Sequence, residues 1–270
     1  MLFVCPKCLS PLCEEGGRAV CRLGHSYDRA RGGYYNLLLS SSAHTHGDNK
    51  EMVLARRAFL GAGHYRPLAE RVAELVTENT PSGVPVLDVG LGEGYYTDVI
   101  ERALFERDGA TRVVGFDISK DAVRAAASRN KRLSLAVASA YRMPLSDSSF
   151  ATAVNMFSPL ALSETRRVLS SGGCFIMAIP GTMHLYGLKS AIYDNPYKNE
   201  VSDTYLEGFR LVSDESLSYP LLLTDREDIR SLFMMTPYAY RTGAIERERL
   251  FSLDALEAIA DFRIFVYRKL

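Results

Sequence analysis

Short apolar segments alternate with segments of helical period along residues 84–180, and this alternation constrains the fold more than any other feature. We expect strands near 84–89, 112–117, 133–138, 151–156 and 173–180, with helices near 94–106, 119–129 and 160–169. Short apolar strands that alternate with helices form a parallel sheet with both faces covered. The sequence therefore predicts an α/β fold with a doubly wound sheet.

Two further helices are predicted ahead of the first strand. Apolar residues recur at helical spacing from Met52 to Leu60, and a second stripe runs from Leu68 to Val76 after Pro67. The polar stretch SSSAHTHGDNKE at 40–51 is typical of a linker. We expect three units, which are a metal-binding module over 1–36, linker and helices over 37–82, and the main domain over 83–270.

The charge balance excludes a strongly basic protein, because 32 Lys and Arg residues face 32 Asp and Glu residues. Residues 1–72 hold ten basic and six acidic residues, a surplus of +4 that fits either an RNA-facing patch or ordinary surface scatter. The apolar start MLFV is too short for a secretory h-region, and no segment approaches a membrane span. The expected compartment is the cytoplasm.

The N-terminal cysteines have the spacing of a metal site. Cys5, Cys8, Cys21 and His25 form two short pairs, and three thiolates with one imidazole suit tetrahedral zinc. The alternative is a redox CxxC, which would stand at a strand-to-helix junction that this segment lacks. We therefore predict one structural zinc ion, with Cys13 as a spare thiol.

Beyond these pairs, RARGGYYNLL mixes arginines with Tyr34 and Tyr35. This combination suits phosphate contacts and base stacking in RNA recognition. Packing of the two tyrosines onto the zinc module explains it equally well.

The turn after the first predicted strand carries Gly90, Gly92 and Gly94. A dinucleotide site needs the spacing G-x-G-x-x-G, and here Tyr95 stands where the third glycine belongs. A ligand at this turn would lie beyond the carboxyl end of the strand. The turn therefore predicts a nucleotide-like ligand that is not a dinucleotide.

Two acidic residues define that ligand further. Asp88 ends the first strand, where a carboxylate would repel a pyrophosphate but suits the ammonium and sulfonium groups of S-adenosylmethionine. Asp117 ends the second strand, where an acidic residue can accept two ribose hydroxyls. Together with the glycine turn, they predict S-adenosylmethionine as cofactor.

The segments ASAYRMPLSDSSFATAV at 138–154 and ETRRVLSSGGCFIMAIPG at 164–181 strengthen this prediction. With the glycine turn, they resemble the class I S-adenosylmethionine-dependent methyltransferases, whose core is a Rossmann-like doubly wound sheet. The resemblance implies methyl transfer as the reaction.

Over essentially the whole chain the sequence resembles one family of these enzymes. The blocks that carry this resemblance are the cysteine pairs, GDNKEMVLARRAFLGAGHYRPL at 47–68, GLGEGYYT at 90–97, PGTMHLYGLKSAIY at 180–193 and LLTDREDIRSLFMMTPYAYR at 222–241. They resemble the RlmA family of large-subunit ribosomal RNA guanine-N1 methyltransferases, whose members include a macrolide-resistance branch. The resemblance implies a 23S rRNA hairpin as substrate, a homodimer, and a zinc-ribbon-like N-terminal module.

The same resemblance implies site residues. It assigns Cys5, Cys8, Cys21 and His25 to zinc, and Tyr65, Gly92, Glu93 and His184 to the methyl donor. For Tyr65 and His184 the residues alone suggest a linker aromatic and a helix-start histidine.

Methyl transfer needs little catalysis by side chains, because a sulfonium methyl group is already activated and positioning dominates the rate. Guanine N1 carries a proton that must leave, and the sequence identifies no base for it. Asn155, at the end of the fourth predicted strand, is a candidate for orienting the guanine edge. Two alternatives stay open, which are a small-molecule methyltransferase with a structural zinc module and a non-catalytic RNA-binding protein that keeps the fold.

Overall fold

The computed structural model describes residues 2–39, 47–201 and 204–270, and it contains two sheets. The smaller is a three-stranded antiparallel sheet near the N-terminus, formed by β1 (Leu12–Glu15), β2 (Arg18–Cys21) and β3 (Ser26–Asp28). Gly16 and Gly17 join β1 to β2 with φ angles of +57° and +80°, a left-handed pair that favours glycine. The predicted linker falls partly on residues 40–46, which lie outside the described residues.

The larger sheet has eight strands in the order β10-β11-β9-β8-β5-β6-β7-β4. In chain order these strands are β4 (Tyr35–Asn36), β5 (Val86–Val89), β6 (Val113–Asp117), β7 (Ser134–Val137), β8 (Phe150–Met156), β9 (Leu169–Pro180), β10 (Phe209–Leu223) and β11 (Leu256–Lys269). All pairs from β4 to β9 are parallel, which confirms the parallel arrangement of the five predicted strands. The sheet extends beyond them on both sides.

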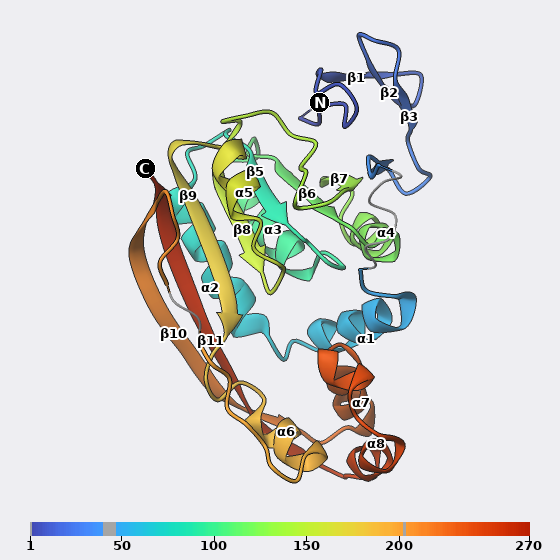
Figure 1. Ribbon diagram of the computed structural model, residues 1–270, viewed down its shortest axis with the longest axis vertical. Coiled ribbons are helices and arrows are strands. Elements are labelled where there is room, and N and C mark those ends of the chain that lie inside the picture. Colours follow the sequence, from blue (N-terminus) through green and yellow to red (C-terminus); the bar gives the residue numbers. More distant parts are fainter. Residues whose placement is uncertain (1, 40–46, 202–203) are drawn as a thin grey trace.

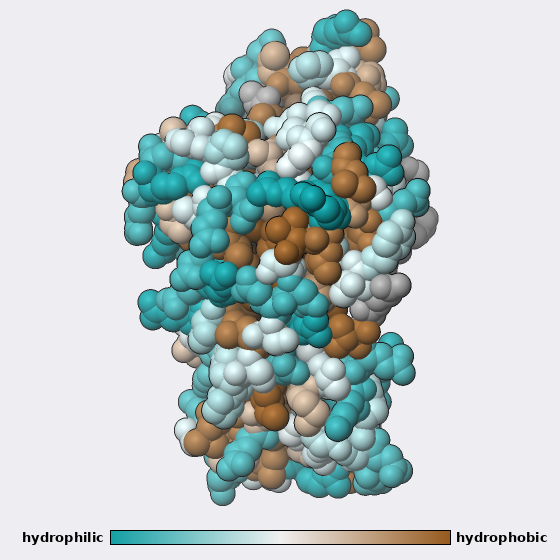
Figure 2. Space-filling view, turned by 90° about the vertical axis from the view of Figure 1, so that its left-hand side faces the viewer, coloured by the Kyte–Doolittle hydropathy of each residue, from teal (hydrophilic) through white to brown (hydrophobic). Residues whose placement is uncertain are grey.

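Two long antiparallel strands complete one edge of the sheet (Figure 1). Along most of β10 half-buried positions alternate with exposed ones, so this edge strand is buried on one face only. Figure 2 views the molecule from the side that carries β10 and shows apolar residues among mostly hydrophilic ones. The predicted parallel sheet is therefore the larger part of a mixed sheet.

Helices connect the strands along the chain. They are α1 (Lys50–Gly61), α2 (Arg66–Asn79), α3 (Tyr95–Asp108), α4 (Lys120–Arg129), α5 (Leu162–Val168), α6 (Tyr186–Ile192), α7 (Arg226–Met234) and α8 (Ala244–Phe251), with a 3-10 turn at Pro237–Tyr240. Asn49 and Ser119 cap α1 and α4, because their side chains accept the N–H groups of Met52 and Ala122. None of the helices in the described residues combines the length and hydropathy of a membrane span.

The sheet separates two apolar cores. Side chains alternate along the buried strands, so Val86 and Val113 face α2, α3 and α4, whereas Leu87 and Val114 face the other core. That second core contains Phe3 and Leu12 of the N-terminal module together with residues of α5. The N-terminal module therefore covers part of one face of the main sheet.

Backbone contacts fix the N-terminal module to the main domain. The Val4 N–H donates to the Pro144 carbonyl at 2.8 Å, and Arg142 donates to the Pro6 carbonyl at 3.2 Å. Strand β4 lies at the end of the predicted module, yet it pairs with β7 of the main sheet. The division at residue 36 stays a prediction, and the strand nearest to it belongs to the larger sheet.

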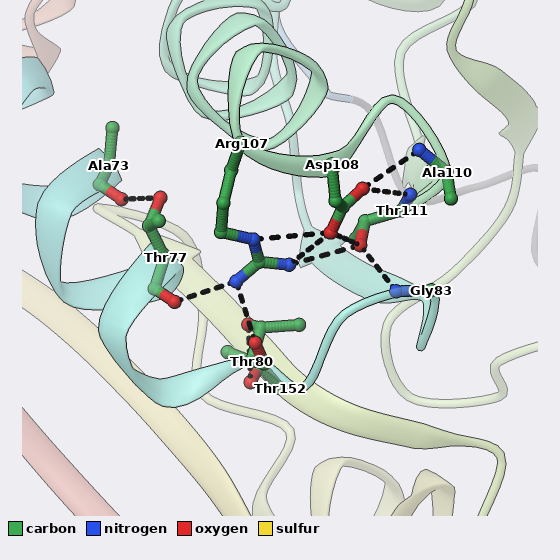
Figure 3. A network of polar contacts seen from close by, with 9 residues as sticks. All are labelled: Ala73, Thr77, Thr80, Gly83, Arg107, Asp108, Ala110, Thr111 and Thr152. Atoms are coloured by element: carbon green, nitrogen blue, oxygen red, sulfur yellow. Dashed lines mark hydrogen bonds and ion pairs between the residues drawn. The ribbon is translucent and has the colours of Figure 1, made fainter.

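A polar network ties α2 and α3 to the start of β5 (Figure 3). Arg107, near the end of α3, donates to the carbonyls of Thr77 and Thr80 at 2.8 and 2.7 Å. Asp108 accepts hydrogen bonds from the hydroxyl and the N–H of Thr111, and these contacts, with a further one from Arg107, hold the pKa of its carboxyl below the usual range. The network lies at the end of β5 opposite to the glycine turn, so it positions the strand without contacting that turn.

Candidate functional site

The predicted zinc residues converge. The ligand atoms of Cys5, Cys8, Cys21 and His25 all lie within 4.8 Å of one another. Nδ1 of His25 is 3.4 Å from Sγ of both Cys5 and Cys21, and the Sγ atoms of Cys8 and Cys21 are 3.6 Å apart. Ligands at ordinary zinc distances in a tetrahedron are separated by about 3.5–3.8 Å. The four residues therefore fit a zinc ion without rearrangement.

The surroundings of the cluster suit thiolate ligands. Hydrogen bonds from Ser10 lower the pKa of Cys8 to about 6, and the Tyr27 hydroxyl lies 3.2 Å from Sγ of Cys5. Cys13 lies on exposed β1 and is not part of the cluster. Cys5, Cys8 and Cys21 thus belong to the cluster, and Cys13 does not.

The glycine turn has the conformation its sequence predicts. Gly90, Gly92 and Gly94 have φ angles of +76°, +58° and +84°, all in the left-handed region. A Cβ on Gly90 would lie 2.5 Å from the Cβ of Ser158, and one on Gly94 would lie 2.7 Å from that of Ala126. Glycine at these two positions lets α4 and the segment after β8 approach the turn.

Asp117 is placed beside this turn. Its Oδ2 accepts the N–H of Gly92 at 3.0 Å, and its Oδ1 accepts the N–H of Ser119 at 2.8 Å. Burial raises the pKa of the Asp117 carboxyl, while the two backbone donors act in the opposite direction. Each carboxylate oxygen retains a second lone pair, so the group can accept further hydrogen bonds from a ligand.

Asp88 is buried beneath the turn with an incomplete hydrogen-bond set. The Thr97 hydroxyl donates to Oδ2 at 2.6 Å, whereas Oδ1 has no protein partner. Burial raises the pKa of Asp88 to about 7. A cationic ligand would satisfy the unpaired oxygen and favour the ionised form. The residues present therefore fit the predicted donor.

Glu93 is also buried, but its side chain points to α4. Arg129 donates to Oε2 at 2.5 and 3.1 Å, and Oε1 has no protein partner. Burial raises the pKa of Glu93 and the charge of Arg129 opposes the shift. Its carboxylate thus holds α4 against the glycine turn.

Tyr65 and His184 are 119 positions apart in sequence and in contact in the structure. The Tyr65 hydroxyl lies 3.3 Å from Nε2 of His184, and Nδ1 accepts the N–H of Asp261 at 3.3 Å. Burial lowers the pKa of His184 to about 3, so the ring is neutral and its proton is on Nε2. His184 therefore donates to the Tyr65 oxygen, which leaves the Tyr65 hydrogen for another acceptor.

A series of aromatic rings connects this pair to the glycine turn. The ring of Phe262 lies 4.9 Å from that of Tyr65 and 4.8 Å from that of His184, centroid to centroid. Phe157 lies 5.7 Å from Phe262 and 6.1 Å from Tyr96, in the first turn of α3. These rings link the Tyr65–His184 pair to the first turn of α3, which follows the glycine turn.

Asn155 is buried near the end of β8, and its amide donates to the Pro159 carbonyl at 3.4 Å. This contact bends the chain after β8 back on itself. The side chain lies near the carboxyl end of β8, next to the strand that ends at the glycine turn.

Sequence reasoning missed Arg56, on α1. Its guanidinium forms an ion pair with Asp48 and donates to the Met235 carbonyl at 3.1 Å. A Cβ added to Gly92 would lie 3.9 Å from Nη1 of Arg56, so this guanidinium is close to the glycine turn. The sequence of α1 does not indicate that Arg56 lies beside the glycine turn, because the polar face of a helix is usually solvated.

Comparison with known proteins identifies both parts of the chain. The family model described as "Methyltransferase domain" matches residues 86–173, and the zinc-ribbon model described as "RlmA, N-terminal" matches residues 3–42. A solved structure of a Bacillus halodurans C-125 protein described as a methyltransferase is 15% identical, with a TM-score of 0.51 over 74% of this chain and 98% of that chain. At this identity the similarity shows the fold alone.

Curated relatives match almost the full length. The 23S rRNA (guanine(748)-N(1))-methyltransferase of Streptomyces fradiae is 34% identical over 252 residues, which are 91% of this chain and 88% of that protein. A Bacillus subtilis (strain 168) protein assigned to 23S rRNA guanine-N1 methylation is 28% identical over 280 residues, covering 99% of this chain and 97% of that protein. The chain therefore belongs to the RlmA family of methyltransferases, in which a zinc ribbon precedes an S-adenosylmethionine-dependent domain.

Proposed function

We propose that this protein transfers a methyl group from S-adenosylmethionine to N1 of a guanine in a hairpin of 23S rRNA. The observation that carries the proposal is the unpaired Oδ1 of buried Asp88 beneath the glycine turn, in a chain 34% identical to an enzyme named for this reaction. A buried carboxylate with a vacant acceptor fits the cationic end of the donor.

Each predicted donor residue has a role in this proposal. Asp88 faces the positive charge, Asp117 accepts the ribose hydroxyls, and the turn at Gly90, Gly92 and Gly94 gives the donor close access to the backbone. The Tyr65 hydroxyl, oriented by His184, supplies one hydrogen bond from the opposite side. Glu93 contributes through its place in the turn, since its side chain is engaged by Arg129.

The bound donor supplies an activated methyl group, and the residues of the chain orient the guanine and exclude water. Asn155 is proposed to orient the guanine edge, supported by its location near the carboxyl end of β8. This strand pairs with β5, whose end carries Asp88. Donor and acceptor would thus meet above two neighbouring strands.

A groove between the zinc ribbon and α4 supports an RNA substrate. It has a volume of about 460 Å³ and is lined by Arg29, Arg31 and Lys131 together with glycines and apolar residues. Arg31 and Lys131, together with Arg29 in its pair with Glu14, suit contacts with a phosphate backbone. The zinc ion that Cys5, Cys8, Cys21 and His25 would bind would hold one wall of this groove in place.

Incorporation of labelled methyl groups tests the proposal. Purified protein with donor should label a 23S rRNA hairpin transcript and should leave free guanosine and small amines unlabelled. Labelling of a small acceptor alone would support a small-molecule enzyme, and donor-independent RNA binding without labelling would support a non-catalytic protein. Either result would overturn the proposal.

Three further properties belong to the same proposal. The family resemblance supports a homodimer, which light scattering across a range of concentrations tests. An rRNA substrate supports a cytoplasmic location, which fractionation tests. The unit boundaries near residues 36 and 82 can be tested by limited proteolysis with mass analysis of the fragments.

A further inference from the structure

Phe157 has a conformation that its residue type does not favour. Its φ angle is +58°, and only four residues other than glycine have a positive φ in the described part of the chain. A phenylalanine with this backbone is strained, because its Cβ crowds the carbonyl group that follows. Strain of this kind persists where the surrounding structure imposes it, and it gathers at functional sites.

Burial does not explain the strain. The Phe157 side chain is 40% exposed, although the residues before it in β8 are buried. A partly exposed aromatic ring contributes less to stability through burial than a fully buried one. Some other use for the ring must account for its position.

The neighbouring residues fix the backbone at Phe157. Its N–H donates to the Ala178 carbonyl at 3.2 Å, and the hydroxyl of Ser158 donates to the Val89 carbonyl at 2.7 Å. Asn155 closes the segment by donating to the Pro159 carbonyl. Ser158 also packs against Gly90, so the segment is locked directly onto the predicted donor turn.

The ring of Phe157 is the exposed member of the aromatic series described above. It lies between Tyr96 and Phe262 at interplanar angles of 56° and 51°, and both of these neighbours are buried. The tilted contacts hold the ring by its edges. An aromatic surface is thereby presented next to the donor residues.

The strand order gives the direction from which an acceptor arrives. The chain runs outward from β5 through β6 to β7 on one side, and it then crosses back to β8 and β9 on the other side of β5 (Figure 1). Ligands of such sheets bind where the order reverses, beyond the carboxyl ends of the strands. With the donor above β5 and β6, the acceptor faces the end of β8, where Phe157 stands.

We propose that Phe157 is the surface on which the acceptor purine stacks while its N1 receives the methyl group. This inference rests on the proposed function. Stacking uses the face of the base and leaves the edge that carries N1 open to the donor. A base turned out of its hairpin loses stacking with its neighbours, and an exposed aromatic ring replaces it.

Glycine substitution separates this role from a structural one. Phe157→Gly relieves the backbone strain, which offsets part of the packing lost with the ring, so the variant should remain folded at the assay temperature. Its kcat/KM for the 23S rRNA hairpin should nevertheless fall by about 10-fold to 100-fold, the range that the loss of one base–aromatic stack gives. The Kd for S-adenosylmethionine, measured by calorimetry, should stay within about twofold, because stacking concerns the acceptor alone.

Further variants make the test specific. Phe157→Tyr should restore activity to near the wild-type level, whereas Phe157→Leu, similar in bulk but without an aromatic face, should not. Ser148→Gly is the matched control, because Ser148 also has a left-handed backbone, with φ of +50°, in the turn before β8. It should leave RNA methylation unchanged.

Two results would overturn the inference. One is normal RNA methylation by Phe157→Gly and Phe157→Leu, and the other is an equal loss of donor binding and methylation in these variants. A wild-type protein that binds the donor but labels no RNA would instead contradict the proposed function, so the two failures are distinguishable.

Discussion

Arg56 lies above Gly92, with its Nη1 atom 3.9 Å from the position that a Cβ of that glycine would occupy. This guanidinium extends from α1 to the turn where the predicted donor binds, and it pairs there with Asp48. Of the acidic groups around the turn, Asp88 is the one proposed to face the positive charge of the donor. We expect Arg56 to balance the negative charge of the donor's carboxylate as well as that of Asp48.

Arg56→Ala should therefore weaken binding of S-adenosylmethionine by about 10-fold to 100-fold, the value of one charge-assisted hydrogen bond. Decarboxylated S-adenosylmethionine should bind the variant and the wild-type protein equally well in calorimetry. Arg57→Ala is the control, because Arg57 faces Ala125 and Ser128 of α4. An equal loss for both ligands would contradict a role in carboxylate binding.

Donor binding should depend on pH through Asp88. Its pKa of about 7 in the free protein means that the carboxyl is protonated in acid and cannot balance a cation. The Kd for S-adenosylmethionine should rise by about tenfold between pH 8 and pH 6. Asp88→Asn should bind weakly at both pH values with no step that centres near pH 7, and a step of unchanged size in this variant would assign it to another group.

The raised pKa of Asp88 also affects the stability of the protein. The Asp88 carboxyl of the unfolded chain titrates near its ordinary value of 3.8, whereas burial raises the folded value to about 7. Between these values the folded protein binds the extra proton, so this group makes the free protein less stable as the pH rises from 4 to 7. Asp88→Asn should remove that part of the pH dependence of Tm.

Zinc content should follow the residue assignment. Cys21→Ser should lose the metal and unfold the N-terminal module, since a unit of this size depends on its ligand for stability. RNA methylation should fall with it, because the groove that carries Arg29 and Arg31 loses one wall. Cys13→Ser should keep one equivalent of zinc by atomic absorption. Full metal content in Cys21→Ser would refute the ligand set.

The network around Arg107 should contribute to stability without affecting the site. Arg107→Ala removes a donor from the carbonyls of Thr77 and Thr80, and we expect a loss of about 2–3 kcal/mol in the free energy of unfolding. Arg124→Ala, which breaks an exposed pair with Asp121, should cost less than about 1 kcal/mol. Donor affinity should be unchanged in both variants, and a change in Arg107→Ala would show that the network reaches the site.

The fold and the site differ in how far the sequence predicts them. The parallel strands and the turn at Gly90, Gly92 and Gly94 follow from local patterns, because strand and turn preferences are expressed within a few residues. The zinc residues follow from spacing in the same way. The antiparallel strands β10 and β11 were not predicted. Their burial alternates from residue to residue, which is also a local strand pattern.

Local sequence patterns do not indicate residues whose role depends on tertiary contacts. Tyr65 and His184 meet across 119 positions, and only the family resemblance indicated them. Arg56 lies near Gly92 and Thr97 donates to Asp88, both from helices. An arginine or a threonine in a helical segment does not by itself indicate such a contact. The left-handed backbone of Phe157 is imposed by contacts with Val89, Gly90 and Ala178, and its own sequence neighbourhood carries no signal for it.

The most direct test of the central claim is a nucleoside analysis of a 23S rRNA hairpin transcript incubated with the protein and S-adenosylmethionine. Mass spectrometry of the digested RNA should show 1-methylguanosine, with a yield that approaches one per transcript and is lost in Asp88→Asn. Methylation of any other nucleoside, or unmodified RNA in the presence of a protein that binds the donor, would contradict the account.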